Sequence, residues 1–156
     1  MVKAKDVMSK DVKICTPTTD LATVATAMWE SGCGVLPVLG NDEEVVGMIT
    51  DRDVCIAVAA KNRLATDIQV REVLCENLYY CAPDDDIQTV LEIMRSGKVY
   101  RLPVIDREAK LVGIISLDDI AHYVDELVAF EKNISYKDVA ITLKAISRRH
   151  LANINK

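Results

Sequence analysis

The sequence predicts a mixed α/β (α+β) fold in which two similar β-α-β-β-α repeats pack sheet to sheet with pseudo-two-fold symmetry, followed by a C-terminal helix. Three observations predict this fold. The chain matches itself when it is shifted so that Pro17 falls on Pro83, each copy alternates short strand-like runs with amphipathic runs, and 156 residues suit one domain or two very small ones. A repeat of about 60 residues is marginal alone, so the open face of each sheet needs the other repeat as cover.

The four prolines reveal the repeat. The spacing from Pro17 to Pro37 recurs between Pro83 and Pro103, so one shift aligns both pairs. The same shift aligns two Leu-Pro-Val strings and needs no gap between residues 6 and 58. An ungapped register of this length indicates an internal duplication. The predicted boundaries are residues 1–66 for the first repeat, 67–125 for the second and 126–156 for a helical extension.

Strands are predicted where apolar residues alternate or run together between Gly, Pro and Asn, and helices where a capping residue precedes an apolar face. In the first repeat the elements are a short strand over 12–15, a helix capped by Thr19 or Asp20 and ended by Gly32 and Gly34, strands over 35–39 and 45–50, and a helix opened by Asp51 or Asp53. In the second repeat they are a strand near 78–81, a helix over 86–95, strands over 101–105 and 110–116, and a helix from 118.

The C-terminal extension has no counterpart in the first repeat. Residues 132–156 hold six basic residues and one acidic residue, Asp138, which Ser135 precedes at capping spacing. The predicted inward face of this amphipathic helix is formed by Val139, Leu143, Ile146 and His150. We expect the helix to pack on the two-repeat module or across a dimer. Contact of its basic face with nucleic acid is the less favoured alternative.

Composition excludes several classes of function. A net charge of −5 and only 4% aromatic residues disfavour binding of nucleic acid by the whole protein. No apolar run approaches the roughly 20 residues of a membrane helix, and the N-terminus lacks the apolar region of a signal peptide. The cysteines are odd in number and none has CxxC spacing, which argues against a disulfide framework or a structural metal site. We therefore expect a reduced, cytoplasmic protein.

Two matched strings are the strongest candidates for chemistry, Gly47–Asp53 (GMITDRD) and Gly113–Asp119 (GIISLDD). In each, a strand ends at a hydroxyl residue, Thr50 or Ser116, and a helix begins. The free amides of a helix start plus a hydroxyl form an anion site of phosphate size, and the final carboxylate can accept hydrogen bonds from a ribose diol. The alternative is that the hydroxyl only caps the helix and the aspartate stabilises its first turn.

Over residues 4–124 the chain resembles the tandem CBS domain, or Bateman module. The resemblance is carried by the paired openings DVMSKDVKICTP and EVLCENLYYCAP, by the Leu-Pro-Val strands and by the G-x-x-T/S-x-x-D strings. It implies the fold described above, with two clefts between the repeats that bind adenosine-containing ligands: AMP, ADP, ATP, S-adenosylmethionine or sometimes NAD. It also implies a regulatory module that performs no chemistry, needs no cofactor, commonly forms a homodimer and signals to a partner protein.

The resemblance assigns site residues by position. It implies that Asp53 and Asp119 bind the ribose hydroxyls and that Thr50 and Ser116 contact ribose or phosphate. It places Thr16 and Ala82 at the cleft entrances. The residues that line the base and phosphate regions are Gly34, Val35, Tyr100 and Arg101. Apolar contacts to adenine from the opposite repeat fall to Met48 and Ile114. In a similar repeat of the γ subunit of AMP-activated protein kinase, an arginine at the Arg101 position holds phosphate. Ala82 lacks the hydroxyl of Thr16 and Asp118 adds a repelling charge, so we expect unequal clefts.

Two functions remain open. The first is a sensor of adenosine-containing ligands, and the second is a structural or stress-related dimer whose clefts have lost their ligand. An enzyme is disfavoured because no nucleophile, base and metal set converges. His122 is expected at the surface or an interface, and Trp29 in the core or a dimer interface rather than stacked on a cofactor.

Overall fold

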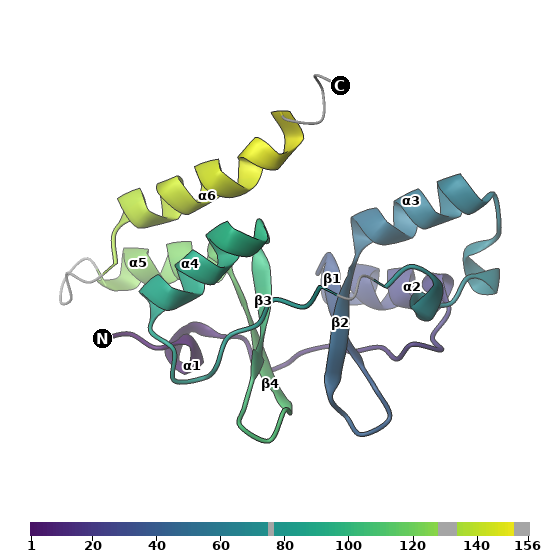
Figure 1. Cartoon of the computed structure of the whole chain (residues 1–156), viewed down its shortest axis with the longest axis horizontal. Helices are drawn as coiled ribbons and strands as arrows, with labels where there is room; N and C mark the ends of the chain where they lie inside the picture. Colours follow the sequence, from purple (N-terminus) through teal and green to yellow (C-terminus); the bar gives the residue numbers. More distant parts are fainter. Residues whose placement is uncertain (75–76, 128–133, 152–156) are drawn as a thin grey trace. The chain divides into compact units, whose positions relative to one another are not determined.

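The computed structural model describes residues 1–74, 77–127 and 134–151 and divides into two compact units (Figure 1). Unit 1 comprises Met1–Lys10 and Tyr79–Lys156, and unit 2 comprises Asp11–Leu78. The mixed α/β class is confirmed, because each unit combines a small antiparallel sheet with helices. In the described part of the chain, no helix has both the length and the apolar character needed to cross a bilayer. Packing of the two sheets against each other stays a prediction, as do the repeat boundaries.

Unit 2 is built around the antiparallel pair of β1 and β2. Its elements are α2 (Leu21–Ser31), β1 (Val35–Leu39), β2 (Val45–Thr50), α3 (Asp51–Lys61) and the short 3₁₀ turns η1 (Ala65–Asp67) and η2 (Val70–Glu72). Asp20 caps α2 by accepting a hydrogen bond from the Thr23 amide at 2.9 Å, and Gly32 ends it in the left-handed conformation at φ 64°. Buried side chains of α2, β1 and β2 form the core, among them Leu21, Val24, Leu36, Val38 and Ile49.

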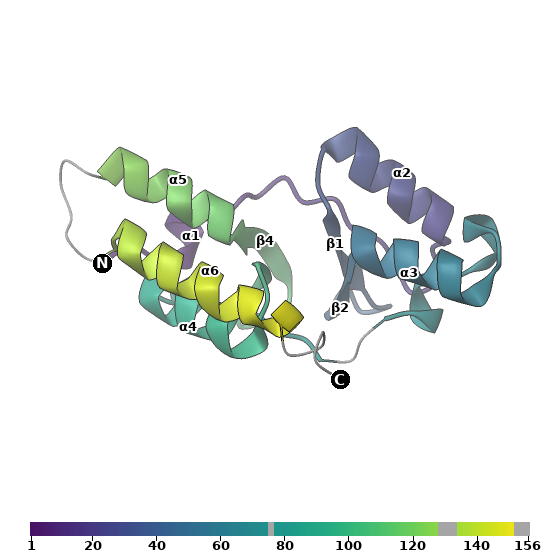
Figure 2. The ribbon, with the colours of Figure 1, turned by 90° about the horizontal axis from the view of Figure 1, so that it is seen from above.

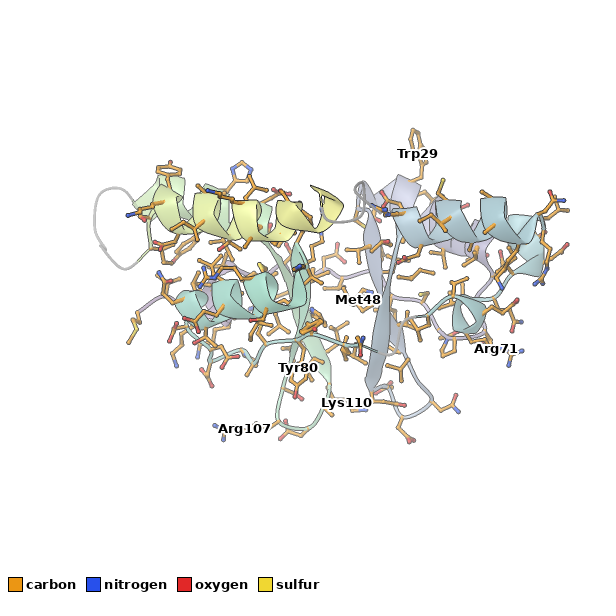
Figure 3. The ribbon with its side chains drawn as sticks, turned by 45° about the horizontal axis from the view of Figure 1, so that its top comes forward. Trp29, Met48, Arg71, Tyr80, Arg107 and Lys110 are labelled. Carbon is orange, nitrogen blue, oxygen red and sulfur yellow. The ribbon has the colours of Figure 1, made fainter. Side chains whose placement is uncertain are left out.

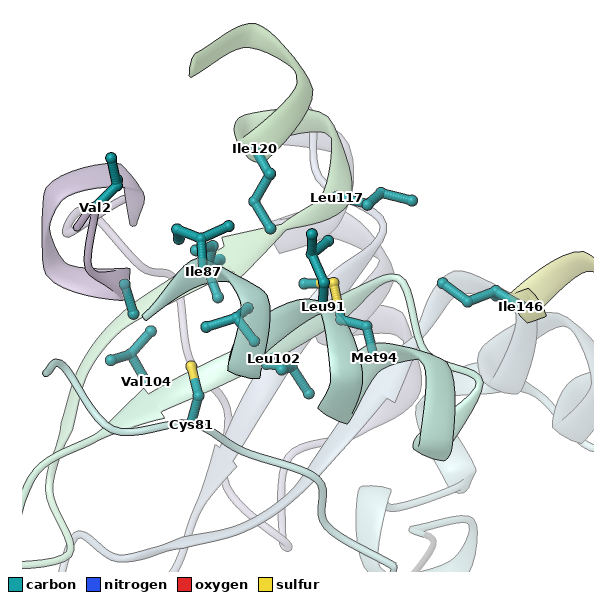
Figure 4. Close-up of a cluster of buried hydrophobic side chains, with 13 residues drawn as sticks. Val2, Cys81, Ile87, Leu91, Met94, Leu102, Val104, Leu117, Ile120 and Ile146 are labelled. Atoms are coloured by element: carbon teal, nitrogen blue, oxygen red, sulfur yellow. The ribbon is translucent and has the colours of Figure 1, made fainter. Parts of the chain in front are cut away.

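Unit 1 repeats this plan and adds a helix at each end. Its elements are α1 (Ala4–Val7), α4 (Ile87–Gly97), β3 (Arg101–Ile105), β4 (Leu111–Ser116), α5 (Leu117–Leu127) and α6 (Tyr136–Leu151). Asp86 caps α4 through the Thr89 amide at 2.9 Å, as Asp20 caps α2. Figure 4 shows the core of unit 1, in which α1, α4, β3, β4, α5 and α6 each contribute apolar side chains.

The strands predicted over 12–15 and 78–81 are wrong. Only Cys15 and Cys81 pair with a sheet, through single parallel bridges to Val38 and Val104. The Cys15 amide donates to the Pro37 carbonyl at 3.0 Å, and the Cys15 carbonyl accepts from the Leu39 amide at 2.9 Å. The next bond toward residue 13 would need an N–H on Pro37, and the next toward residue 17 an N–H on Pro17. The prolines that reveal the repeat therefore limit this pairing to one residue.

The opening segments of the two repeats are exchanged. Met1–Lys10, which opens the first repeat, packs in unit 1 with most of the second repeat, and residues 68–74, which open the second, pack in unit 2 with most of the first. The Ala4 amide donates to the Asp85 carbonyl at 2.9 Å, and the amide of Val70, which the repeat aligns with Ala4, donates to the Thr19 carbonyl at 2.9 Å. Both side chains are fully buried. Each core is thus closed by chain that the sequence repeat assigns to the other half.

The C-terminal helix α6 lies along α4 and α5 of unit 1 (Figure 2). Ile146 is buried and Val139 packs against the core, as predicted. The prediction that Leu143 faces inward is wrong, because Leu143 is 47% exposed, whereas Thr142 is fully buried. Thr142 fits there because its hydroxyl donates to the Asp138 carbonyl and accepts from Arg95, each at 2.9 Å. The side chain of His150 lies outside the described residues.

The exchange predicts that fragment boundaries decide folding. We expect residues 11–78, which contain the buried Ile68 and Val70, to be more helical and to unfold more cooperatively than residues 1–66, which lack both side chains. Circular dichroism of the two fragments during urea titration measures this, and their similar length makes them matched controls. Equal cooperativity in the two fragments would contradict the exchange.

The exchange also explains the glycine of each G-x-x-T/S-x-x-D string. A Cβ on Gly113 would lie 2.5 Å from the Met8 sulfur and 2.9 Å from the Ser9 carbonyl oxygen, whereas the atoms nearest to one on Gly47 belong to the Leu74 side chain, the closest at 2.6 Å. We expect Gly113→Ala to lower the free energy of unfolding by about 1–3 kcal/mol. Gly47→Ala should cost less, because a leucine side chain can rotate and backbone cannot. Urea titration of the full chain measures both, and a larger loss for Gly47→Ala would refute this ordering.

Candidate functional site

The hydroxyl and carboxylate of each matched string form a closed helix cap. The Thr50 hydroxyl accepts from the Asp53 amide at 3.2 Å, while Asp53 Oδ2 accepts from the Thr50 amide at 2.9 Å and from its hydroxyl at 2.7 Å. In the second copy the three distances are 3.0, 2.8 and 2.6 Å between Ser116 and Asp119. The capping role of these side chains is therefore confirmed, their ligand role stays a prediction, and α3 begins at Asp51, as predicted, with Thr50 as its N-cap. This reciprocal arrangement is a capping box.

The cap leaves one carboxylate oxygen available in each copy. Within the described residues, Oδ1 of Asp53 and Oδ1 of Asp119 make no hydrogen bond. Both aspartates are half-buried at the start of a helix, where backbone amides concentrate positive potential. A carboxylate held through one oxygen is fixed in direction and can still accept from a ligand hydroxyl through the other. Capping and ligand binding are thus compatible roles for the same side chain.

The hairpin register brings further predicted residues to these helix starts. Val35 lies opposite Thr50, and Arg101 lies opposite Ser116. Arg101 is half-buried and, among the described residues, has no acidic partner and no side-chain hydrogen bond. An unpaired guanidinium in a partly desolvated position is suited to bind an anion from outside the chain. Its counterpart Val35 is buried and carries no charge.

Two more pairs of predicted residues lie next to the caps. The Gly34 carbonyl accepts from the Asp51 amide at 3.0 Å, and the Tyr100 carbonyl accepts from the Leu117 amide at 2.9 Å, so both residues are tied to a helix start. Met48 precedes Thr50 by two residues on β2, and Ile114 precedes Ser116 by two residues on β4. Both Met48 and Ile114 are partly exposed. The sequence did not indicate that Ser9 pairs with Ile114, exchanging backbone hydrogen bonds of 2.9 and 3.0 Å. The only signal for Ser9 was its place in the repeated opening segment.

Thr16 and Ala82 are not brought to the caps of their own units. Cys15 pairs with Val38 near the end of β1, so Thr16 follows at the strand end away from Val35 and Thr50. There the Thr16 amide donates to the Thr19 hydroxyl at 3.0 Å. In the second copy the Ala82 amide donates to the Asp85 carboxylate at 2.8 Å. Both residues therefore sit in matching turns, and their roles at a cleft entrance stay predictions.

The described thiols in the cores serve packing. Burial raises the pKa of the Cys15 thiol to about 11, and burial followed by the Asp85 charge raises the pKa of Cys81 to about 12. Both thiols are thus protonated at neutral pH, and a thiolate is the form that attacks or binds metal. Cys75 lies outside the described residues. Among those described, no three His, Cys, Asp or Glu side chains are grouped so as to hold a metal ion.

Comparison with known proteins places this geometry in a family. A sequence model of the CBS domain matches residues 4–60 and again 70–126. Hypoxic response protein 1 of Mycobacterium tuberculosis is 35% identical over 136 residues, which cover 86% of this chain and 94% of that protein. A crystal structure of Hypoxic Response Protein I with two coordinated zinc ions superimposes with a TM-score of 0.71 at 33% identity, covering 78% of this chain and 98% of that chain.

Two ligand-bound structures share the fold at lower identity. The CBS domain pair of protein MJ0100, in complex with 5′-methylthioadenosine and S-adenosyl-L-methionine, has a TM-score of 0.71 at 22% identity and covers 81% of this chain and 98% of that one. CBSX2 in complex with AMP has a TM-score of 0.69 at 18% identity, with coverage of 81% and 98%. At these identities the likeness concerns the fold alone.

Proposed function

Because this chain belongs to the CBS-domain family and carries two of its repeats, we propose that it is a regulatory module that binds an adenosine-containing ligand and transmits its occupancy to a partner protein. The ligand class is AMP, ADP, ATP or S-adenosylmethionine, and the module performs no catalysis. The observation that carries the proposal is Arg101, a half-buried guanidinium without an acidic partner in the described part of the chain. It lies opposite Ser116, whose cap presents the open oxygen of Asp119.

The residues support distinct contacts to such a ligand. Asp119 Oδ1 can accept from a ribose hydroxyl, and Arg101 can donate to a phosphate in a bidentate manner. The first copy, with Asp53 and Thr50, repeats the groups for ribose but has Val35 in place of the cation. We infer that a phosphorylated ligand binds more tightly at the copy that contains Arg101. The homodimer, the cytoplasmic location and the identity of the partner stay predictions.

The alternative function is a structural or stress-related dimer without a ligand. It is favoured by the completeness of the two caps, since Asp53 and Asp119 already have a structural role. Calorimetric titration of the purified full chain with AMP, ADP, ATP and S-adenosylmethionine separates the two functions. Absence of heat for all four would favour the structural dimer.

The carboxylate of the second copy should be needed for affinity. We expect Asp119→Ala to weaken AMP binding by about 1.5–3 kcal/mol, the range for a hydrogen bond to a charged group. Loss of the cap should also lower the free energy of unfolding by about 1 kcal/mol, so binding is measured by calorimetry well below the unfolding temperature. Asp118→Ala, at the exposed neighbouring residue, is the matched control and should not weaken binding. Equal losses of AMP affinity in the two variants would show that Asp119 does not contact the ligand.

Arg101 should recognise phosphate rather than nucleoside. We expect Arg101→Ala to weaken AMP binding roughly ten-fold or more, as for a lost charge-assisted contact of about 1.5–3 kcal/mol. Adenosine, which lacks the phosphate, should bind the variant nearly as well as it binds the wild-type protein. Titrations of both ligands into both proteins form the complete comparison. If AMP and adenosine lose equal affinity, Arg101 does not contact phosphate.

A further inference from the structure

The proposed ligand contacts of unit 1 and the surface that holds α6 meet at one backbone junction. Tyr100 directly precedes Arg101, and Leu117 directly follows Ser116. Because Arg101 and Ser116 are partners across the hairpin, their two neighbours come together at the same end of the sheet. There the Leu117 amide donates to the Tyr100 carbonyl at 2.9 Å. This pair, the Tyr100/Leu117 junction, links the ligand contacts to the start of α5.

Both side chains of the junction contact the surroundings of α6. The Tyr100 hydroxyl oxygen lies 3.5 Å from that of Ser147, which is in α6. Leu117 is buried and belongs to the same core cluster as Ile146 of α6 (Figure 4). A movement of the junction therefore changes the surface on which α6 rests.

Few buried side chains hold α6 on unit 1. Among the thirteen buried residues of the core cluster, Ile146 alone comes from α6. Thr142 is also fully buried, where its hydroxyl accepts from Arg95 at 2.9 Å. Ile141 and Leu143 of the same helix are exposed. Because elements with few buried apolar contacts open at a lower free energy than the core, we expect α6 to leave its seat more readily than the core of unit 1 unfolds.

The matching junction of unit 2 has the same backbone bond but different side chains. The Gly34 carbonyl accepts from the Asp51 amide at 3.0 Å, so a glycine and an aspartate stand where unit 1 has the tyrosine and the leucine. Trp29 stands where unit 1 has Arg95, and it points away from the helix and is 87% exposed (Figure 3). Its placement in the core, one of the two sites that the sequence predicts for it, is therefore wrong. The cation Arg101 and the side chains that support α6 thus occur in the same copy.

The arrangement with α6 in place is also the one that presents the ligand contacts. In it Arg101 lies opposite Ser116, and Asp119 is fixed in direction through its Oδ2 atom. A ligand that uses these groups favours this arrangement over one in which the junction has moved. A ligand shifts such an equilibrium by its difference in affinity for the two states, and the effect is reciprocal. A bound ligand should therefore hold α6, and a docked α6 should strengthen ligand binding.

We infer that the docking of α6 depends on the occupancy of the site that contains Arg101: a phosphorylated adenosine ligand holds α6 on α4 and α5, and loss of the ligand releases the helix. The inference rests on the proposed function, because it needs a ligand at this site, and it names the element that transmits occupancy. Release frees a helix with four basic residues and one acidic residue over 136–151. It also uncovers apolar side chains of α4 and α5. A partner protein therefore meets different surfaces in the two states.

Hydrogen exchange of the full-length wild-type protein, followed by mass spectrometry, tests the effect of the ligand on α6. Without ligand, the amides of α6 should exchange faster than those of α4, because α6 opens while the core stays folded. We expect AMP, at a concentration that calorimetry shows to be saturating, to slow exchange in α6 about five-fold or more, the lower end of typical coupling between sites.

The reciprocal effect is measured by calorimetric titration of AMP into two variants. Ile146→Asp places an unpaired carboxylate in the buried cluster and should displace α6. Ile141→Asp adds the same charge at an exposed residue of the same helix and is the matched control. We expect Ile146→Asp to weaken AMP binding about five-fold or more and Ile141→Asp to weaken it less than about two-fold.

Three outcomes would overturn the inference. The first is exchange in α6 that is no faster than exchange in α4 without ligand, because the helix would then not open separately. The second is exchange in α6 that saturating AMP leaves unchanged, and the third is equal AMP affinity in the two folded variants. If Ile146→Asp does not fold, exchange in the wild-type protein decides alone. Absence of heat for all four ligands would instead show that the proposed function has failed.

Discussion

The structure depends on the exchange of the two opening segments. Val2 and Ala4 close the core that contains the second repeat, and Ile68 and Val70 close the core that contains the first. All four are nearly or fully buried, so either sheet-and-helix layer would expose apolar surface if its borrowed segment left. In a unit of this size, the few kilocalories from two buried aliphatic side chains are a large part of net stability. The sequence repeat and the folding unit are therefore different stretches of chain, which local pattern alone does not reveal.

Local chemistry is predictable where one residue decides the structure. The strands over 35–39, 45–50 and 101–105 have the bounds that the sequence predicts, because turns and apolar runs mark both ends. The predicted strands ending at Cys15 and Cys81 fail because ladder length depends on the partner strand, whose Pro37 or Pro103 supplies no donor. The predicted inward face of α6 is partly wrong because Thr142, a polar residue, is buried by its bonds to Asp138 and Arg95. A hydropathy pattern describes each side chain alone and does not include the hydrogen-bond partners that allow a polar side chain to be buried.

The candidate site shows why duplication alone cannot separate a cap from a ligand contact. Thr50 with Asp53 and Ser116 with Asp119 have nearly the same geometry, and both pairs do the structural work of starting a helix. A ligand could use the remaining oxygen of each carboxylate. Whether that oxygen is free depends on the hydrogen-bond geometry, which composition does not reveal. The difference between the copies lies at the paired position across the hairpin, where Val35 is apolar and Arg101 is charged. The cap is shared by both copies, and the residue opposite the cap is where the two copies differ in charge.

The helices of the two units also combine shared core positions with surface positions that differ. Core positions such as Met28 and Met94 are buried in both, whereas the exposed Trp29 of unit 2 stands where unit 1 has Arg95, which donates to Thr142 of α6. In unit 2 two hydrogen bonds hold the start of α3: the Asp51 amide donates to the Gly34 carbonyl, and the Thr50 hydroxyl donates to Asp53. A ligand bound to Asp53 would therefore contact this helix start directly. Such a ligand could transmit its occupancy only by favouring a different arrangement of that turn, and the shift cannot exceed the difference in its binding free energy for the two arrangements.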